Sequence, residues 1–297
     1  MSPARWLLRS HTGRIAFALG VVYFAWGSSY LALHVALESF PPLLLSGMRN
    51  LFAGIALFIF AARRTTAWPT PIEVRNAGIV GAMLVGLSSG LLAFGMGSVS
   101  TGAAAVIIAT VPLFATVIAA IAGRPVAKGE WVAVALGLAG IVLLNHGNGS
   151  AASASGSIVI LMAALAWAVG AHLASRLVLP TDLFMSTALQ IGLGGAISTV
   201  VAWVGGERVQ HVAALAVVAF VYLMVIGTIA AYSAYGFLIR RTSPIVASSC
   251  MYVNPIVAVA LGALLLGEPV TRWTIMATLA ILLSVALSFW CDRRRAG

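Results

Sequence analysis

Charged residues are scarce in this 297-residue chain. Asp, Glu, Lys and Arg together make up 8% of it, whereas hydrophobic residues make up 61%. A soluble domain of this length carries about 25% charged residues. The composition therefore excludes an ordinary water-facing surface and predicts a chain whose main solvent is the lipid bilayer. Thirty glycines agree with this interpretation, because small residues let membrane helices approach closely.

Cysteine is also rare. The two cysteines, Cys250 and Cys291, both fall in apolar stretches and form neither a metal-binding spacing nor a disulfide framework. The formal net charge of +10 does not indicate nucleic-acid binding, because the basic residues come in small groups between apolar runs. We therefore expect no metal, no cofactor and no nucleic-acid partner.

Ten apolar runs are long enough to cross a bilayer, which requires about 20 residues each. Turn-like segments such as TAWPTP at 66–71 and GEPVTR at 267–272 separate them. Basic residues precede the first run, and we interpret it as a retained span rather than a cleaved signal peptide. The expected spans are residues 15–36, 42–62, 75–97, 101–122, 130–146, 156–177, 183–203, 213–238, 244–266 and 272–291.

Lys and Arg are distributed unevenly between the two sides of the membrane. Ten spans place both termini on one side, and 14 of the 17 basic residues fall on that side. Arg208 and Arg272 fall on the opposite side, and Arg49 lies within the second span. Since positively charged loops stay in the cytoplasm, we expect a multi-pass protein with cytoplasmic N- and C-termini.

The two halves of the sequence resemble each other. Trp26 precedes Arg49 by 23 residues, and Trp167 precedes Gln190 by the same number. Prolines follow the same rule, since Pro112 comes 12 residues after a serine and Pro255 comes 12 residues after another. The motif GRPV in the first half is matched by GEPV in the second.

Each half contains five expected spans, an odd number, so the halves must cross the membrane in opposite directions. The sequence thus predicts an all-α membrane protein with ten transmembrane helices in two inverted five-helix repeats. The repeats are expected at 1–146 and 157–297, joined by a Gly/Ser/Ala-rich linker at 147–156. Inverted repeats with a binding site at their interface are typical of transporters.

Several motifs carry a family resemblance: AWGSSY in the first span, STGAAAVIIATVPLFATVIAAI in the fourth, and SPIVASSCMYVNPIVAVALGALLLGEPVTRW across the ninth and tenth. The chain resembles the drug/metabolite transporter superfamily, specifically its ten-helix members with two EamA-type repeats. Within that superfamily it looks like the bacterial aromatic amino acid exporters. The resemblance implies an inner-membrane exporter that works by alternating access. One departure is Arg124, which replaces the family's Glu that the second half keeps as Glu268.

Trp26 and Trp167 are the two tryptophans near the middle of expected spans. An indole facing lipid at this depth would leave its N–H without a partner, so each should face protein or a wet cavity. Tyr30 and His34 follow Trp26 at i+4 and i+8 and therefore share its helix face. We predict that this face lines a substrate cavity, with helix–helix packing as the alternative.

Four further residues are assigned to the same cavity: Phe94, Tyr232, Tyr235 and Asn254. A cavity with aromatic faces, hydroxyl groups and little charge suits a flat, partly apolar organic molecule. Aromatic amino acids and other neutral amino acids fit this description, as do many drug-like compounds.

Arg49 is the only charged residue expected inside a span, which makes it a candidate for function. It is predicted to meet a substrate carboxylate, or else to bond to helix-end carbonyls or extend toward the surface. His34 and His172 are the only groups in the spans that titrate near neutral pH. Because no Asp or Glu falls in the middle of a span, we expect facilitated diffusion or weak coupling through a histidine.

Pro112 and Pro255 fall inside the fourth and ninth spans at equivalent positions. A proline removes one helix hydrogen bond and bends the helix, so the pair is predicted to act as hinges, with fixed kinks as the alternative.

No phosphate-binding loop and no nucleophile–base–acid set appears, so we do not expect an enzyme. We expect a monomer that exports small neutral metabolites. Two alternatives remain: a broad-specificity drug exporter, and an intramembrane enzyme or lipid flippase.

Overall fold

The computed structural model describes residues 11–65, 67–147, 153–242, 246 and 249–296, and this part of the chain is almost entirely helical. Ten membrane-crossing units confirm the expected number of spans. Within the described residues, nine are long and apolar enough to span a bilayer, and the tenth, α14, is a shorter apolar helix. The units are α2 (His11–Leu37), α3 (Pro42–Ala62), α4–η1–α5 (Pro71–Gly81, Ala82–Leu87, Ser88–Gly95), α6–α7 (Thr101–Ile108, Val111–Ile121), α8 (Lys128–Gly147), α9 (Ala154–Arg176), α10 (Leu183–Val204), α11–η2–α12 (Ala214–Tyr222, Leu223–Ala230, Ala231–Arg241), α14 (Cys250–Leu266) and α15 (Arg272–Ala296).

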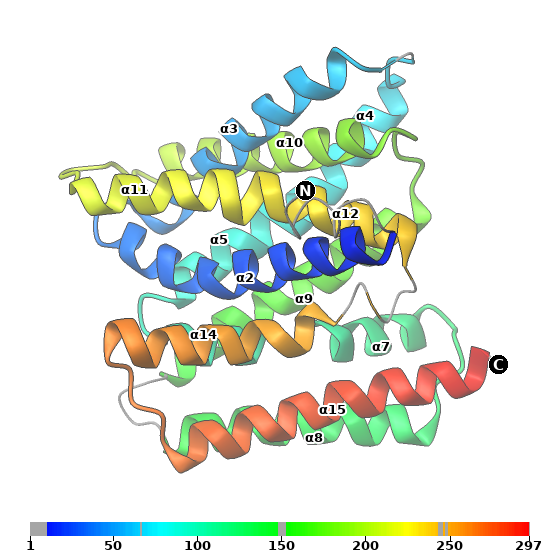
Figure 1. Cartoon of the computed structure of the whole chain (residues 1–297), viewed down its shortest axis with the longest axis vertical. Coiled ribbons are helices and arrows are strands. Elements are labelled where there is room, and N and C mark those ends of the chain that lie inside the picture. Colours follow the sequence, from blue (N-terminus) through cyan, green and yellow to red (C-terminus); the bar gives the residue numbers. More distant parts are fainter. Residues whose placement is uncertain (1–10, 66, 148–152, 243–245, 247–248, 297) are drawn as a thin grey trace, which may run out of the picture.

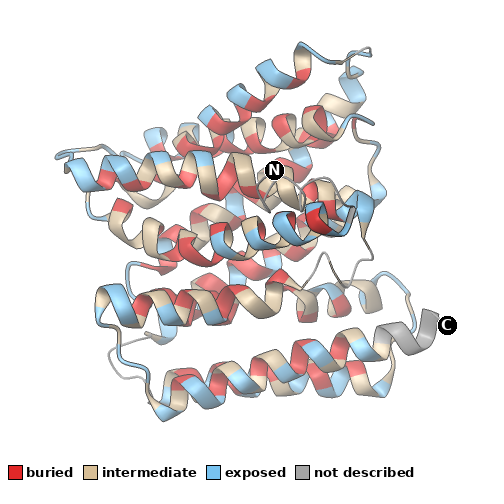
Figure 2. Cartoon of the chain, in the orientation of Figure 1, coloured by how far each residue is buried: buried red, intermediate tan, exposed pale blue. Residues whose placement is uncertain are grey.

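The outer surface of the bundle is apolar. Ile121, Leu264 and Val142 are between 68% and 82% exposed. Figure 2 shows buried residues on the faces that the helices turn toward one another and exposed residues on the outer faces. Apolar surface this extensive would be unfavourable in water, so these faces contact lipid.

The helices run side by side with their axes roughly parallel to one direction (Figure 1). The ends that carry Arg63, Arg64, Arg176, Arg240 and Arg241 point the same way, and we name this the basic end. The start of α2 and the end of α15 lie at the basic end, on the right in Figure 1.

The closest helix pair, α3 with α10, shows the inverted repeat directly. A Cβ built on Gly54 would meet the backbone of Gly192, and one built on Gly195 would meet the backbone of Leu51. Gly54 and Gly195 occupy equivalent repeat positions, and so do Leu51 and Gly192. The contact is therefore reciprocal, as a two-fold relation between the halves requires. Small residues permit this close approach.

The first span of each half packs against the third and fourth spans of the other half. Helix α2 contacts α11, η2, α12 and α14, whereas α9 contacts α4, η1, α5, α6 and α7. The inverted arrangement predicted from the sequence is thus present. It places α2 and α9, which carry the two mid-span tryptophans, in the centre of the bundle.

Two π-helical segments were not predicted. They are η1 (Ala82–Leu87) and η2 (Leu223–Ala230), and both begin at equivalent positions of the two repeats. In η2 the Thr228 hydroxyl donates to the carbonyl of Leu223, five residues back, over 3.0 Å. A π segment widens the helix locally, and such segments often occur at functional sites.

The sequence suggested that the fourth span is one helix bent at Pro112, but the structure divides this span into two short helices. It divides at Ala109 and Thr110, and Pro112 lies in the first turn of α7, where its missing N–H costs nothing. Pro255, by contrast, lies inside the continuous helix α14. The two prolines therefore occupy different local structures, and a hinge at either position stays a prediction.

Acidic side chains hold helix N-termini at the end opposite the basic end. The Glu207 carboxylate accepts from the backbone N–H groups of Leu43 and Leu44, at 3.3 and 2.7 Å. The Glu268 carboxylate accepts from the N–H groups of Thr101 and Gly102 and from the Thr101 hydroxyl. A negative charge at a helix N-terminus is stabilising, so these contacts fasten loops of the second half onto helices of the first.

Candidate functional site

A central cavity of about 120 Å³ lies between the two halves. Its walls come from seven membrane-crossing units of both repeats, and two of these units contain the π segments. The lining residues are Trp26, Ser29, Tyr30, Leu33, Arg49, Asn50, Ser88, Ser89, Leu92, Ile108, Val111, Trp167, Gly227, Thr228, Tyr232, Met251 and Asn254.

One wall is an aromatic cluster. The rings of Trp26 and Trp167 meet edge to face, with centroids 6.4 Å apart and an interplanar angle of 84°. The ring centroid of Tyr232 lies 5.6 Å from that of Trp26 and 6.4 Å from that of Trp167. The ring centroid of Tyr235 lies 5.1 Å from that of Trp26. Such geometry stabilises aromatic pairs and presents ring faces and edges to a neighbouring ring.

Another wall is polar but largely self-satisfied. Ser29 donates to the carbonyl of Ala25 at 2.5 Å, and the Asn50 amide donates to the carbonyl of Ser46 at 2.7 Å. Thr228 makes the equivalent bond within η2. The hydroxyl groups of Ser29 and Thr228 have one donor each and use it within their own helices, so their oxygen atoms remain available as acceptors.

Arg49 and Asn254 differ from the other polar lining residues. They are only 9% and 8% exposed. Arg49 makes one long hydrogen bond, from Nη2 to Ser89 Oγ at 3.4 Å, and its Nε has no partner among the described residues. The Oδ1 atom of Asn254 is likewise without a partner in the described part of the chain. In the same residues, no carboxylate forms an ion pair with Arg49.

A second cavity of about 470 Å³ adjoins the first. Val111, Trp167 and Met251 line both, so these three residues form the boundary between them. The second cavity follows one face of α9 from Trp167 through His172 to Arg176 at the basic end. The second cavity therefore extends from the boundary of the central cavity to the basic end.

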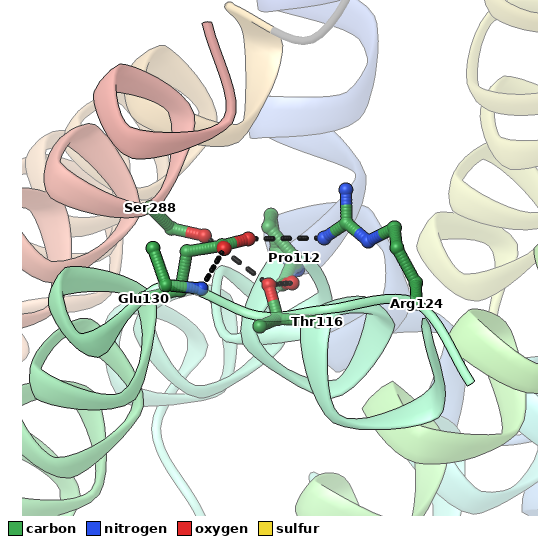
Figure 3. Close-up of polar contacts among 6 residues, drawn as sticks. Pro112, Thr116, Arg124, Glu130 and Ser288 are labelled. Atoms are coloured by element: carbon green, nitrogen blue, oxygen red, sulfur yellow. Dashed lines mark hydrogen bonds and ion pairs between the residues drawn. The ribbon is translucent and has the colours of Figure 1, made fainter. Parts of the chain in front are cut away.

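An ion pair with one buried partner lies in the wall of the second cavity (Figure 3). The Arg124 guanidinium donates to the Glu130 carboxylate at 3.0 Å, and Glu130 is only 1% exposed. Glu130 also accepts from the N–H of Ala127 at 2.8 Å. Nearby, the hydroxyl groups of Thr116 and Ser288 lie 3.3 Å apart and join α7 to α15.

Six of the predicted site residues line the central cavity: Trp26, Tyr30, Arg49, Trp167, Tyr232 and Asn254. Tyr235 and Pro112 line the second cavity. His34 lines neither of the two cavities. Phe94 is 61% exposed on the outer surface of the bundle, so it does not belong to this site. Phe94 lies on a different face of α5 from Ser88 and Leu92, which do line the cavity.

Sequence reasoning missed several polar lining residues and the ion pair between Arg124 and Glu130. Ser88 and Ser89 directly follow the π segment η1, whose position a regular 3.6-residue period does not reveal. The ion pair had a weak signal in the sequence. Arg124 replaces the repeat-matched glutamate, and Glu130 follows six residues later as its partner.

The model of a family described as "EamA-like transporter family" matches this chain twice, over residues 13–146 and 154–290. The "Uncharacterized inner membrane transporter YedA" of Escherichia coli (strain K12) is 37% identical over 272 residues, covering 91% of this chain and 89% of that protein. The "Uncharacterized transporter YdfC" of Bacillus subtilis (strain 168) is 25% identical over 264 residues, covering 88% and 86%. "Protein PecM" of Dickeya dadantii is 25% identical over 246 residues, covering 82% and 81%.

A solved structure, described only as "Crystal structure of protein", superposes with a TM-score of 0.66. It covers 95% of this chain and 99% of the solved chain at 17% sequence identity, so it supports the fold alone.

Proposed function

This chain belongs to the EamA-like transporter family of the drug/metabolite transporter superfamily, and from that premise we propose that it exports aromatic and other neutral amino acids across a bacterial inner membrane. The single observation that best supports this substrate class is the aromatic wall of the central cavity. Trp26, Trp167 and Tyr232 come from both halves and converge with centroid separations of 5.6–6.4 Å. A planar, partly apolar side chain would pack against such a wall.

The proposed mechanism is alternating access, with the described structure as the state that loads substrate. Positively charged loops favour the cytoplasm, so the basic end, where the second cavity lies, would face the cytoplasm. At the opposite end, Glu268 fastens its loop to the start of α6. Export would require the second cavity to close and that contact to open.

The described residues that line the central cavity supply no carboxylate for ion coupling. The proposal is therefore facilitated diffusion down the substrate gradient, or weak coupling through His172, which lines the second cavity.

Purified protein in liposomes tests the proposal. Radiolabelled tryptophan or phenylalanine should move down its gradient without ATP and without an imposed proton gradient. Failure of every aromatic amino acid to move would contradict the proposed substrate class. Equal competition by many unrelated drug-like compounds would instead indicate a broad-specificity exporter.

A further inference from the structure

Two buried polar atoms that face the central cavity, Arg49 Nε and Asn254 Oδ1, have no hydrogen-bond partner among the described residues, and one is a donor while the other is an acceptor. Resting on the function proposed above, we propose that Arg49 binds the carboxylate of the substrate and Asn254 accepts a hydrogen bond from its ammonium group. The site would then select α-amino acids over aromatic acids or amines that lack one of these groups.

Burial of Arg49 carries the first half of this proposal. A guanidinium has five N–H donors, and this one makes a single long bond to a neutral hydroxyl while 9% exposed. The neighbouring lining groups Asn50, Ser88 and Ser89 are neutral. Burying a cation without a counter-ion is strongly unfavourable, so the cavity is electrostatically incomplete until an anion enters it.

A carboxylate complements the Arg49 guanidinium better than other small anionic groups do. Its two oxygens match the planar fork of a guanidinium and form paired, charge-assisted hydrogen bonds. A phosphate monoester normally requires several converging basic residues, and Arg49 is the only Lys or Arg among the described residues that line the central cavity.

The position and burial of Asn254 support the proposed recognition of the ammonium group. Asn254 lies on α14, in the second repeat, whereas Arg49 lies on α3, in the first repeat. Its Oδ1 is a buried acceptor without a protein partner among the described residues, and an ammonium group supplies the missing donor. The aromatic cluster of Trp26, Trp167 and Tyr232 lines the same cavity, so a guanidinium, an amide oxygen and aromatic rings all face one space.

Competition measured with the wild-type protein tests the selection without any variant. Liposomes that take up labelled phenylalanine are offered unlabelled phenylalanine, 3-phenylpropionate or phenethylamine. We expect the last two, each lacking one charged group, to compete at least about 10-fold less well, because each leaves a buried polar group unpaired. Equal competition by all three would overturn the proposal.

Variants then assign the roles. Arg49→Gln should raise the half-saturating phenylalanine concentration about 10-fold or more while leaving competition by phenethylamine unchanged or stronger. Arg49→Lys should restore part of the affinity, since it keeps the charge but loses the fork. Asn254→Asp should strengthen competition by phenethylamine. Arg75→Gln, which removes an exposed arginine outside both cavities, is the matched control and should change neither value.

The failures of the two proposals are distinguishable. If phenylalanine moves but Arg49→Gln weakens all three competitors equally, the role of Arg49 is structural and this inference fails alone. If no aromatic solute moves through the wild-type protein, the proposed function fails as well.

Discussion

Trp26 and Trp167 occupy equivalent positions of the two repeats, 141 residues apart in sequence, yet their rings meet edge to face 6.4 Å apart. Residues related by a two-fold relation can meet only near its axis. The pair therefore locates the central cavity at the interface of the inverted halves, which is where transporters of this architecture bind their substrates.

Replacing either tryptophan should impair transport more than folding. In Trp26→Ala or Trp167→Ala, the loss of one aromatic partner removes roughly 0.5–1.5 kcal/mol of ring–ring interaction beyond the lost contact area. We expect flux per folded molecule to fall several-fold while the yield of folded protein changes little. Trp203→Ala, at a side chain that is 64% exposed, is the control. Unchanged flux in both central variants would show that the aromatic wall is not part of the transport path.

Glu268 should control opening at the end opposite the basic end. Its carboxylate accepts three hydrogen bonds from Thr101 and Gly102, and bonds to a charged group contribute roughly 1.5–3 kcal/mol each. Glu268→Gln should therefore increase the labelling rate of a cysteine placed at Ser100. Glu38→Gln, an exposed glutamate, is the control. An unchanged labelling rate at Ser100 would mean that other contacts keep this end closed.

The ten spans and their inverted arrangement could be predicted from the sequence because hydrophobic runs and repeat spacings are properties of the chain alone. The expected second span, 42–62, matches α3 at both ends, since Pro42 and the arginines after Ala62 mark them chemically. Trp26 and Trp167 were found as cavity residues for a related reason. The energetic penalty of placing an indole in lipid does not depend on neighbours.

The features that could not be predicted from the sequence depend on contacts between distant segments. Phe94 was misplaced because its aromatic ring suits lipid as well as it suits a cavity, and only packing decides between them. The break at Ala109 and Thr110 lies in an apolar run with no glycine beside the break. The burial of Glu130 depends on α7 and α15, which flank the second cavity.

The tight packing of α3 on α10 should be sensitive to added volume. A Cβ at Gly54 would meet backbone atoms of Gly192, which cannot move aside as a flexible side chain could. Gly54→Val should therefore destabilise the protein by about 1–3 kcal/mol, seen as a lower unfolding temperature in detergent. Gly20→Val is the matched control, because a Cβ at Gly20 meets nothing within 4 Å. Equal unfolding temperatures for the two variants would contradict the reciprocal glycine contact.

The proline at the break between α6 and α7 should matter for the rate of transport. Pro112→Ala restores the missing N–H and allows the two short helices to join, which would stiffen one wall of the second cavity. We expect slower exchange flux at an unchanged yield. Pro71→Ala, in the first turn of α4 and outside both cavities, is the control and should leave flux unchanged. If both variants transport normally, the break is a fixed feature and not a hinge.

The central claim is that substrate occupies the cavity between the halves and reaches it from the basic end. The most direct test places a cysteine at Ser89, beside Arg49, in a protein in which Cys250 and Cys291 are replaced, and measures its reaction with a membrane-impermeant maleimide in oriented vesicles. We expect labelling from the cytoplasmic side, and we expect phenylalanine to slow it in proportion to its occupancy of the site. Labelling that phenylalanine leaves unaffected, or that occurs only from the opposite side, would contradict the central claim.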